Sequence, residues 1–178
     1  MLYYFFPYYT FDPKDTLIYF LAGRYEFHDK GIDIFIKALS RLNEMLKKSK
    51  SSKTILAFVW VPANFRNIKP ELLENKTLYQ DIKDALDEVI GDVGKNIIYS
   101  LASGKKITKE SLFDEEFLAE MKIRIARFVK KGKPPLVTHD LYDENDLILK
   151  SIISANLKNE EQDQVKIIYY PLYLSGAD

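Results

Sequence analysis

Two cations separated by six positions lie in one short loop with glycine at both ends. The loop is Gly23-Arg24-Tyr25-Glu26-Phe27-His28-Asp29-Lys30-Gly31. The guanidinium of Arg24 offers a planar fork to phosphate oxygens, and the ammonium of Lys30 is a point charge. An apolar run precedes the loop and an amphipathic segment follows it, and the first backbone N–H groups of a helix are unpaired donors. The pattern therefore predicts an anion site at Arg24 and Lys30, the alternative being an ordinary solvated turn.

The segments on both sides of the loop predict a strand and a helix. Residues 17–22 form a short, apolar, aromatic-rich run that is typical of a buried strand. Residues 32–48 carry apolar side chains at helical spacing on one face, and lysines follow at the C-terminal end. A second continuous apolar run occupies residues 54–61. Strand, helix and strand in this order predict a βαβ unit and hence a parallel sheet.

The segment 64–133 has a different character and predicts a helical insertion. A first amphipathic helix is expected to end near Gly91 and Gly94, and a second covers residues 108–131 with Thr108 and Ser111 as candidate N-caps. An ordinary crossover between parallel strands needs far fewer residues. The insertion is therefore a lid or an interaction module, and its long amphipathic helices favour contact with a partner, including a second copy.

The α/β pattern resumes after the insertion. Residues 136–139 predict a short strand, residues 147–157 a helix and residues 165–170 a further strand. The apolar residues 1–11 contain a proline and no basic run, which indicates an edge strand or an extended segment rather than a signal peptide or a membrane span. His139 lies in an apolar strand, so we expect a core histidine rather than a catalytic one.

Composition excludes several classes of protein. With 47% hydrophobic residues, the 178-residue chain can build one core, or one domain with an appendage. Lys+Arg and Asp+Glu both number 26, so bulk charge does not indicate a nucleic-acid partner. The absence of cysteine excludes disulfides and thiolate sites and fits a reducing compartment, and two histidines do not favour a metal site. We expect a cytoplasmic protein.

Three segments follow one another in the order and spelling of a known family. They are Gly23-Arg24-Tyr25-Glu26-Phe27 with Lys30-Gly31, then Leu136-Val137-Thr138-His139-Asp140 with its acidic turn, then Val165-Lys166-Ile167-Ile168 with Pro171 and Leu174. They resemble the C-terminal nucleotide-sugar domain of glycogen synthases of the animal, fungal and archaeal type. The resemblance implies an α/β fold: a partial Rossmann-like parallel sheet, half of a GT-B C-terminal domain, that carries the helical insertion.

The resemblance also implies roles for four residues. In that family the loop arginine and lysine bind the diphosphate of the nucleotide sugar and stabilise the departing nucleotide, which makes Arg24 and Lys30 the expected catalytic and nucleotide-binding residues. Tyr173 and Leu174 match positions that line the nucleoside pocket, where an aromatic side chain meets the base. The alternative for Tyr173 is an ordinary aromatic residue at a strand end.

A parent enzyme of this family would transfer glucose from UDP- or ADP-glucose to the non-reducing end of an α-1,4-glucan with retention, and without a cofactor. The family's N-terminal domain and its paired-glutamate segment have no counterpart in residues 1–178, so we expect a fragment that is inactive alone. Segment 64–133 is then expected to contact other subunits. Two alternatives remain open: a non-catalytic interaction module on a Rossmann-like scaffold, and another nucleotide-sugar glycosyltransferase.

Overall fold

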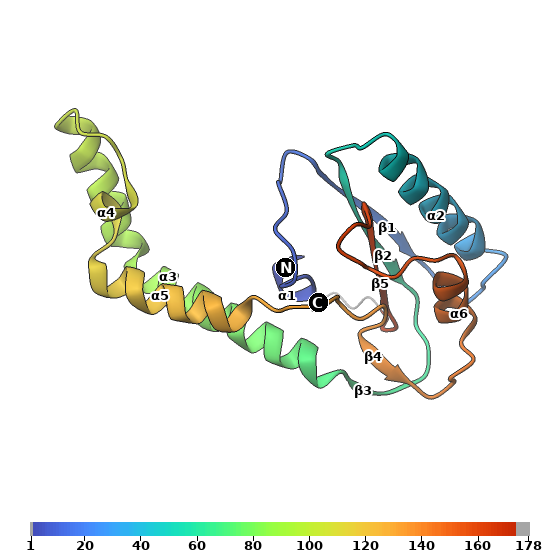
Figure 1. Ribbon diagram of the computed structural model, residues 1–178. Helices are drawn as coiled ribbons and strands as arrows, with labels where there is room; N and C mark the ends of the chain where they lie inside the picture. Colours follow the sequence, from blue (N-terminus) through green and yellow to red (C-terminus); the bar gives the residue numbers. More distant parts are fainter. Residues whose placement is uncertain (1, 174–178) are drawn as a thin grey trace. The chain divides into compact units, whose positions relative to one another are not determined.

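The computed structural model describes residues 2–173, with side chains from Tyr4 onward, and divides into two compact units (Figure 1). The α/β unit comprises Tyr8–Leu72 and 132–173, and the helical unit comprises 2–7 and Leu73–Lys131. In chain order the elements are α1 (Leu2–Phe5), β1 (Thr16–Ala22), α2 (Ile32–Lys48), β2 (Thr54–Trp60), β3 (Phe65–Ile68), α3 (Pro70–Ala102), α4 (Lys109–Leu112), α5 (Glu115–Phe128), β4 (His139–Leu141), α6 (Leu147–Ser154) and β5 (Val165–Tyr170).

Three parallel strands form the main sheet in the order β1-β2-β5. The ladder between β1 and β2 begins at Thr16 opposite Thr54, and every later residue of β1 keeps that register. A single parallel bridge between Val137 and Tyr169 adds to the β5 side. The predicted α/β fold with a parallel sheet is thus confirmed, and the predicted bounds of α2 and β5 match the structure.

The core of the α/β unit lies between the sheet and the helices α2 and α6, which contact each other (Figure 1). Alternate residues of β2 and β5 face these helices, as the pleat of a strand requires. The core residues are Ile55, Ala57 and Val59 of β2, Val165, Ile167 and Tyr169 of β5, Ile32, Ile36 and Leu39 of α2, and Ile148 and Ile152 of α6. This packing holds the strand ends, and the loops that follow them, in fixed positions.

β1 is less buried than its apolar sequence predicts. Leu17, Ile18, Tyr19 and Phe20 are between 39% and 56% exposed. β1 lies at the edge of the sheet, because β2 is its one partner among the described strands. An edge strand is covered by fewer neighbours than a central one, so the expectation of a buried strand at 17–22 is wrong.

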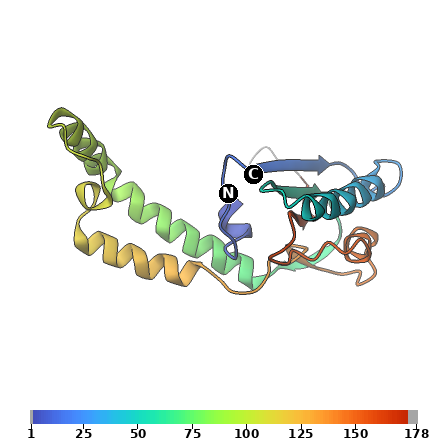
Figure 2. The same cartoon turned by 45° about the horizontal axis from the view of Figure 1, so that its top comes forward.

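Helices α3 and α5 of the helical unit lie side by side in both views (Figures 1 and 2). The guanidinium of Arg124 on α5 pairs with Asp81 on α3, and the rings of Tyr79 and Phe128 are 5.9 Å apart. Within residues 2–173, no helix is both long and apolar enough to span a bilayer.

Two expectations about these helices are wrong. α3 continues through Gly91 and Gly94, and neither glycine has a positive φ. A glycine inside a helix costs only ~1 kcal/mol relative to alanine, which a long helix with tertiary contacts tolerates. The single helix expected at 108–131 is instead two helices, α4 and α5. The second begins at Glu115, because Asp114 caps it by accepting a hydrogen bond from the Phe117 N–H at 2.7 Å. The N-cap prediction for Thr108 is confirmed, on the short helix α4.

Two predicted strands also differ from the structure. For residues 1–11 the sequence predicts an edge strand or an extended segment; the structure has the short helix α1 at Leu2–Phe5 and no helix or strand from there to Thr16. At 136–139, Val137 makes only an isolated bridge, and β4 starts at His139. β4 pairs antiparallel with β3, which lies in the segment predicted to be a helical insertion.

Candidate functional site

The carboxyl ends of the parallel strands meet at one edge of the main sheet. Ala22 of β1, Trp60 of β2 and Tyr170 of β5 occupy one register position at that edge. Gly23 continues the ladder, because its N–H donates to the carbonyl of Trp60 at 3.3 Å. In open parallel sheets, ligands bind in the crevice outside the carboxyl ends of the strands. The loops that start here are therefore the place to look for a site.

A cavity of about 400 Å³ opens at this edge and brings together two of the predicted site residues. Arg24 and Tyr173 both line it. The other walls are Ala22, Gly23, Trp60, Pro62 and Leu172. Trp60 is held by edge-to-face contacts with Phe20 and Tyr170, whose ring centroids lie 5.7 and 4.7 Å away. The volume lies within the range of small-molecule pockets, roughly 300–1,000 Å³.

Arg24 presents an unpaired cation to this cavity. Its side chain is exposed and, within residues 2–173, forms no hydrogen bond or ion pair with the protein. Such a guanidinium is available for bidentate binding of phosphate or carboxylate oxygens. Tyr173 is 76% exposed, so its ring is open to a ligand. The predicted residue Leu174 lies outside the described residues.

Lys30 belongs to the same loop but does not line the cavity. Its ammonium lies 3.6 Å from a carboxylate oxygen of Glu26, one helical turn earlier, and both side chains are largely exposed. Its aliphatic stem passes Gly23, where an added Cβ would lie 3.8 Å from Lys30 Cγ. An exposed pair of this kind is weak, so Glu26 does not hold the ammonium of Lys30 firmly in place.

The N-terminus of α2 is not the open anion site that the sequence predicts. Ile32 N–H already donates to the carbonyl of Phe27, and the carboxylate of Asp33 occupies the first turn, 3.1 Å from His28 Nδ1. Burial opposes ionisation of Asp33, but the hydrogen bonds from His28 and from the Ile34 N–H, together with the nearby charges of His28 and Lys37, outweigh burial and hold the pKa of Asp33 below its ordinary value. Gly31 caps the helix with φ 64°, a left-handed conformation that glycine adopts without strain. The N–H of Ile32 is therefore not free to bind an anion.

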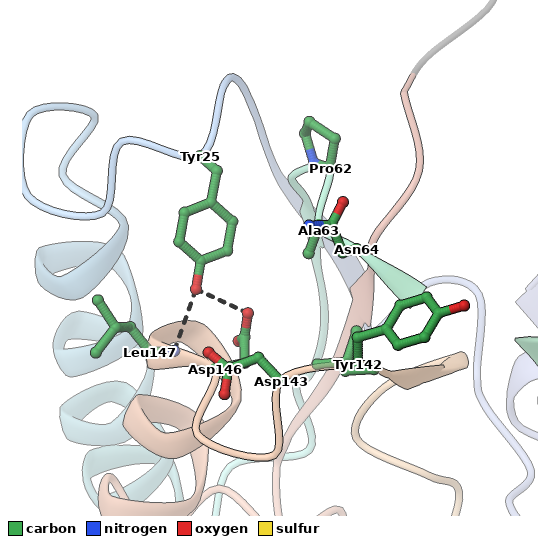
Figure 3. Close-up of a pocket in the computed structure, with 9 residues that line it drawn as sticks. Tyr25, Pro62, Ala63, Asn64, Tyr142, Asp143, Asp146 and Leu147 are labelled. Atoms are coloured by element: carbon green, nitrogen blue, oxygen red, sulfur yellow. Dashed lines mark hydrogen bonds between the residues drawn. The ribbon is translucent and has the colours of Figure 1, made fainter. Parts of the chain in front are cut away.

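Tyr25 ties the loop to the start of α6 (Figure 3). Its hydroxyl donates to Asp146 Oδ2 at 2.7 Å and accepts from the Leu147 N–H at 3.1 Å. Asp146 is almost fully buried and caps α6 by accepting from the Leu149 N–H at 2.8 Å. Burial and the Asp146 hydrogen bond raise the pKa of Tyr25 to about 12, so the phenol remains a neutral donor. This tie fixes the residue next to Arg24.

His139 is buried and satisfied, as expected. Its Nδ1 lies 2.8 Å from Thr138 Oγ1, and its ring contacts Phe65 and Tyr170. Burial lowers its pKa, which favours the neutral imidazole. Among residues 2–173, no group of three or more His, Cys, Asp or Glu side chains is arranged to hold a metal ion.

Sequence reasoning missed the Tyr25–Asp146 contact. An aspartate directly before the apolar segment 147–157 is an N-cap signal, so the sequence contains evidence for the cap on α6. The partner of Asp146 lies 121 residues away, and a single sequence carries no signal for that pairing.

The comparisons with known proteins agree with the sequence motifs. A family model described as glycogen synthase matches residues 2–178. The chain is 35% identical over 172 residues to "Glycogen [starch] synthase" of Dictyostelium discoideum, which covers 96% of this chain and 20% of that protein. It is 34% identical over 179 residues to the protein of the same name from Neurospora crassa, covering 98% of this chain and 25% of that protein.

A human relative gives the same result. The chain is 35% identical over 174 residues to "Glycogen [starch] synthase, liver" of Homo sapiens, which covers 97% of this chain and 25% of that protein. The chain thus spans a fifth to a quarter of the length of these curated relatives, and the resemblance seen in its motifs is confirmed. The chain belongs to the glycogen synthase family.

Proposed function

We propose that this chain supplies the nucleotide-binding edge of an enzyme that transfers glucose from UDP- or ADP-glucose to the non-reducing end of an α-1,4-glucan, with retention. The observation that carries the proposal is the unpaired guanidinium of Arg24 beside the ring of Tyr173 in one cavity at the carboxyl edge of a parallel sheet. The printed names of the relatives, which are glycogen synthases, support the same activity.

Arg24 is the proposed group that stabilises the leaving nucleotide. Cleavage of the bond between glucose and the diphosphate places negative charge on the departing phosphate oxygens, and a preformed cation next to that charge lowers the barrier. Lys30 adds a second charge when it leaves Glu26 for the phosphate. Arg24 and Lys30 can together stabilise the negative charge of the departing phosphate. We therefore propose that the reaction needs no cofactor beyond its two substrates, the nucleotide sugar and the glucan.

Tyr173 is the proposed contact for the nucleobase. A ring that is 76% exposed at the cavity wall offers a flat apolar face, and aromatic groups stack on such faces. We propose a nucleoside-contacting role for Leu174 as well, the next residue in the sequence. Because stacking accepts any base, this residue does not select UDP over ADP.

The remaining features of the proposal rest on the family. The acceptor would bind mainly through parts of the parent enzyme that the relatives contain beyond the matched quarter, so the 178-residue chain alone is proposed to be inactive. We also propose a cytoplasmic location. Glucose transfer to glycogen by the isolated chain, supplied with UDP-glucose, would contradict the proposed inactivity.

The nucleotide site is tested by titrating the isotope-labelled chain with UDP and then with ADP, followed by heteronuclear NMR. We expect saturable shifts at Gly23, Arg24, Lys30 and Tyr173, and loss of those shifts in Arg24→Ala. Arg41→Ala is the matched control, because Arg41 on α2 is also exposed and has no protein partner within residues 2–173.

Two outcomes decide between the open alternatives. Shifts that persist in Arg24→Ala would show that the nucleotide binds elsewhere. An absence of shifts with either nucleotide would contradict the nucleotide site and favour the interaction module.

The helical unit has a second proposed function, contact between subunits. Several apolar side chains of α3, α5 and the residue that ends α5 are strongly exposed: Ile90, Ile98, Tyr99, Leu101, Ile123 and Val129 are 54–70% exposed. Monomeric proteins rarely expose large apolar patches, and such patches often mark protein interfaces. This surface supports the expectation that segment 64–133 joins copies of the parent enzyme.

Light scattering on charged variants tests the contact. Ile98→Glu with Leu101→Glu should convert an oligomer into a monomer, because the two new carboxylates would be buried in the interface. Ile34→Glu on α2 is the matched control, since Ile34 is 67% exposed in the other unit. A wild-type chain that is already monomeric would contradict self-association by this chain.

A further inference from the structure

A second pocket opens at the same edge of the main sheet and has a different lining (Figure 3). Its volume is about 450 Å³, within the range of small-molecule sites. The loop after β1 contributes Tyr25, the segment after β2 contributes Pro62 to Asn64, and the turn after β4 contributes Tyr142 and Asp143. Pro62 also lines the cavity that contains Arg24, so the two share a wall.

The apolar part of the pocket includes two tyrosine rings as well as Pro62, Ala63, Leu141 and Leu147. Tyr142 is 61% exposed, and the Arg66 guanidinium carbon lies 5.3 Å from its ring centroid, which restrains the ring. Tyr25 contributes a second ring, fixed by its hydrogen bonds to Asp146 and Leu147. An aromatic ring that is restrained in this way can contact the C–H face of a sugar ring with little loss of side-chain entropy.

The polar part of the pocket has unused hydrogen-bonding capacity. Asp143 Oδ1 accepts from the Asn145 N–H at 2.8 Å, whereas Oδ2 of Asp143 has no protein partner within residues 2–173. The side-chain amide of Asn64 also lacks a partner among the described residues, and the backbone at Asn64 is held by the Tyr142 N–H at 3.1 Å. A carboxylate accepts hydrogen bonds, and an amide both donates and accepts them. Together the two groups can bind the hydroxyl groups of a ligand.

The charge of the lining decides which class of ligand fits. Asp143 and Asp146 line the pocket, and no lysine or arginine does. A phosphate would be repelled by these carboxylates, which distinguishes this pocket from the cavity of Arg24. The described residues contain no cluster suited to a metal ion. An uncharged polyhydroxy compound is the ligand that matches rings, amide and carboxylates together.

We infer that the pocket formed by Tyr25, Asn64, Tyr142 and Asp143 is a saccharide subsite that binds a glucosyl unit of an α-1,4-glucan. The identity of the sugar rests on the proposed function, whereas the preference for an uncharged polyhydroxy ligand rests on the lining alone. The shared wall at Pro62 puts the glucan chain beside the nucleotide cavity.

Titration of the labelled chain with maltoheptaose, followed by heteronuclear NMR, tests the subsite. We expect shifts at Tyr25, Asn64 and Tyr142, and an affinity about tenfold lower in Tyr142→Ala. Tyr142→Phe should restore most of the affinity because it keeps the ring. Tyr99→Ala is the matched control: Tyr99 is 69% exposed and also lies under a cation, with Lys105 Nζ 5.9 Å from its ring centroid.

A parallel titration with UDP separates this inference from the proposed nucleotide site. Maltoheptaose binding in this pocket that Tyr142→Ala weakens about tenfold supports the subsite, whether or not UDP binds. UDP binding without any maltoheptaose shift overturns the subsite and leaves the nucleotide site standing. Maltoheptaose shifts outside this pocket, or equal losses in Tyr142→Ala and Tyr99→Ala, also overturn it.

Discussion

The two cavities at the carboxyl edge of the main sheet share Pro62 but differ in charge. One contains the unpaired guanidinium of Arg24 and the exposed ring of Tyr173, and the other contains two aspartates, an amide and two tyrosines. The first suits an anion and the second a neutral polyhydroxy ligand. A reaction that moves a sugar from a diphosphate to a glucan needs both kinds of surface next to each other. The difference in charge, rather than in size, assigns each cavity its ligand.

Reversal of the charge at Arg24 should have the largest effect. In Arg24→Glu, a carboxylate replaces the cation that faces the phosphates, so UDP affinity should fall by at least about 100-fold. Calorimetric titration measures the loss, with Arg41→Glu as the control. Maltoheptaose affinity should remain unchanged, and a parallel loss of sugar binding would show that the two cavities are one site.

Removal of the Asp146 carboxylate should lower the stability of the fold that holds both cavities. Asp146→Ala deletes the cap of α6 and leaves the Tyr25 hydroxyl without its acceptor, for a combined destabilisation of about 2 kcal/mol. Urea unfolding measures the loss. Asp143→Ala is the control, because Asp143 is exposed and should change stability by less than about 0.5 kcal/mol. Equal effects of the two substitutions would contradict the structural role of Asp146.

The phenol of Tyr25 should make stability depend on alkaline pH. Its pKa is raised from 10.0 to about 12 in the folded chain, first by burial and then by the hydrogen bond to Asp146. Folding therefore favours the protonated phenol, so this contribution is present below pH 10.0 and is lost as pH rises toward about 12. Tyr25→Phe should lower stability by about 1 kcal/mol at neutral pH and flatten the alkaline slope. An unchanged slope would contradict the assignment.

Lys30 should have the smallest effect on nucleotide binding. Lys30→Ala should reduce UDP affinity by only about threefold, because the ammonium lies outside the cavity and must first leave Glu26. Glu26→Gln should raise the affinity slightly, since it frees Lys30. A loss in Lys30→Ala as large as that in Arg24→Glu would show that Lys30 is the main phosphate ligand.

The elements that the sequence predicts well are those with strong periodicity. α2 and β5 match their predicted bounds, because the first has one apolar face and the second is a short run of β-branched and aromatic residues interrupted only by Lys166. The helices of segment 64–133 are less predictable. Gly91 and Gly94 do not end α3, and one local hydrogen bond from Asp114 decides where α5 begins. Such competition between local bonds and helix propagation depends on small free-energy differences.

The candidate site, like the helices of segment 64–133, is only partly predictable from the sequence. Arg24 is recognisable from its loop and its motif, and the parallel sheet explains why it meets Tyr173 at one edge. The expected anion site at the start of α2 is wrong, because Asp33 occupies it. The pocket of Tyr25 and Tyr142 depends on contacts between segments more than 100 residues apart, which a single sequence does not reveal.

Calorimetric titration of UDP into the chain saturated with maltoheptaose tests the pair of adjacent sites most directly. We predict that UDP binds to the saturated chain with an affinity within about twofold of that for the free chain, and that Arg24→Ala abolishes this binding. Mutual exclusion of the two ligands, or UDP binding that survives Arg24→Ala, would contradict separate charged and neutral sites at this edge.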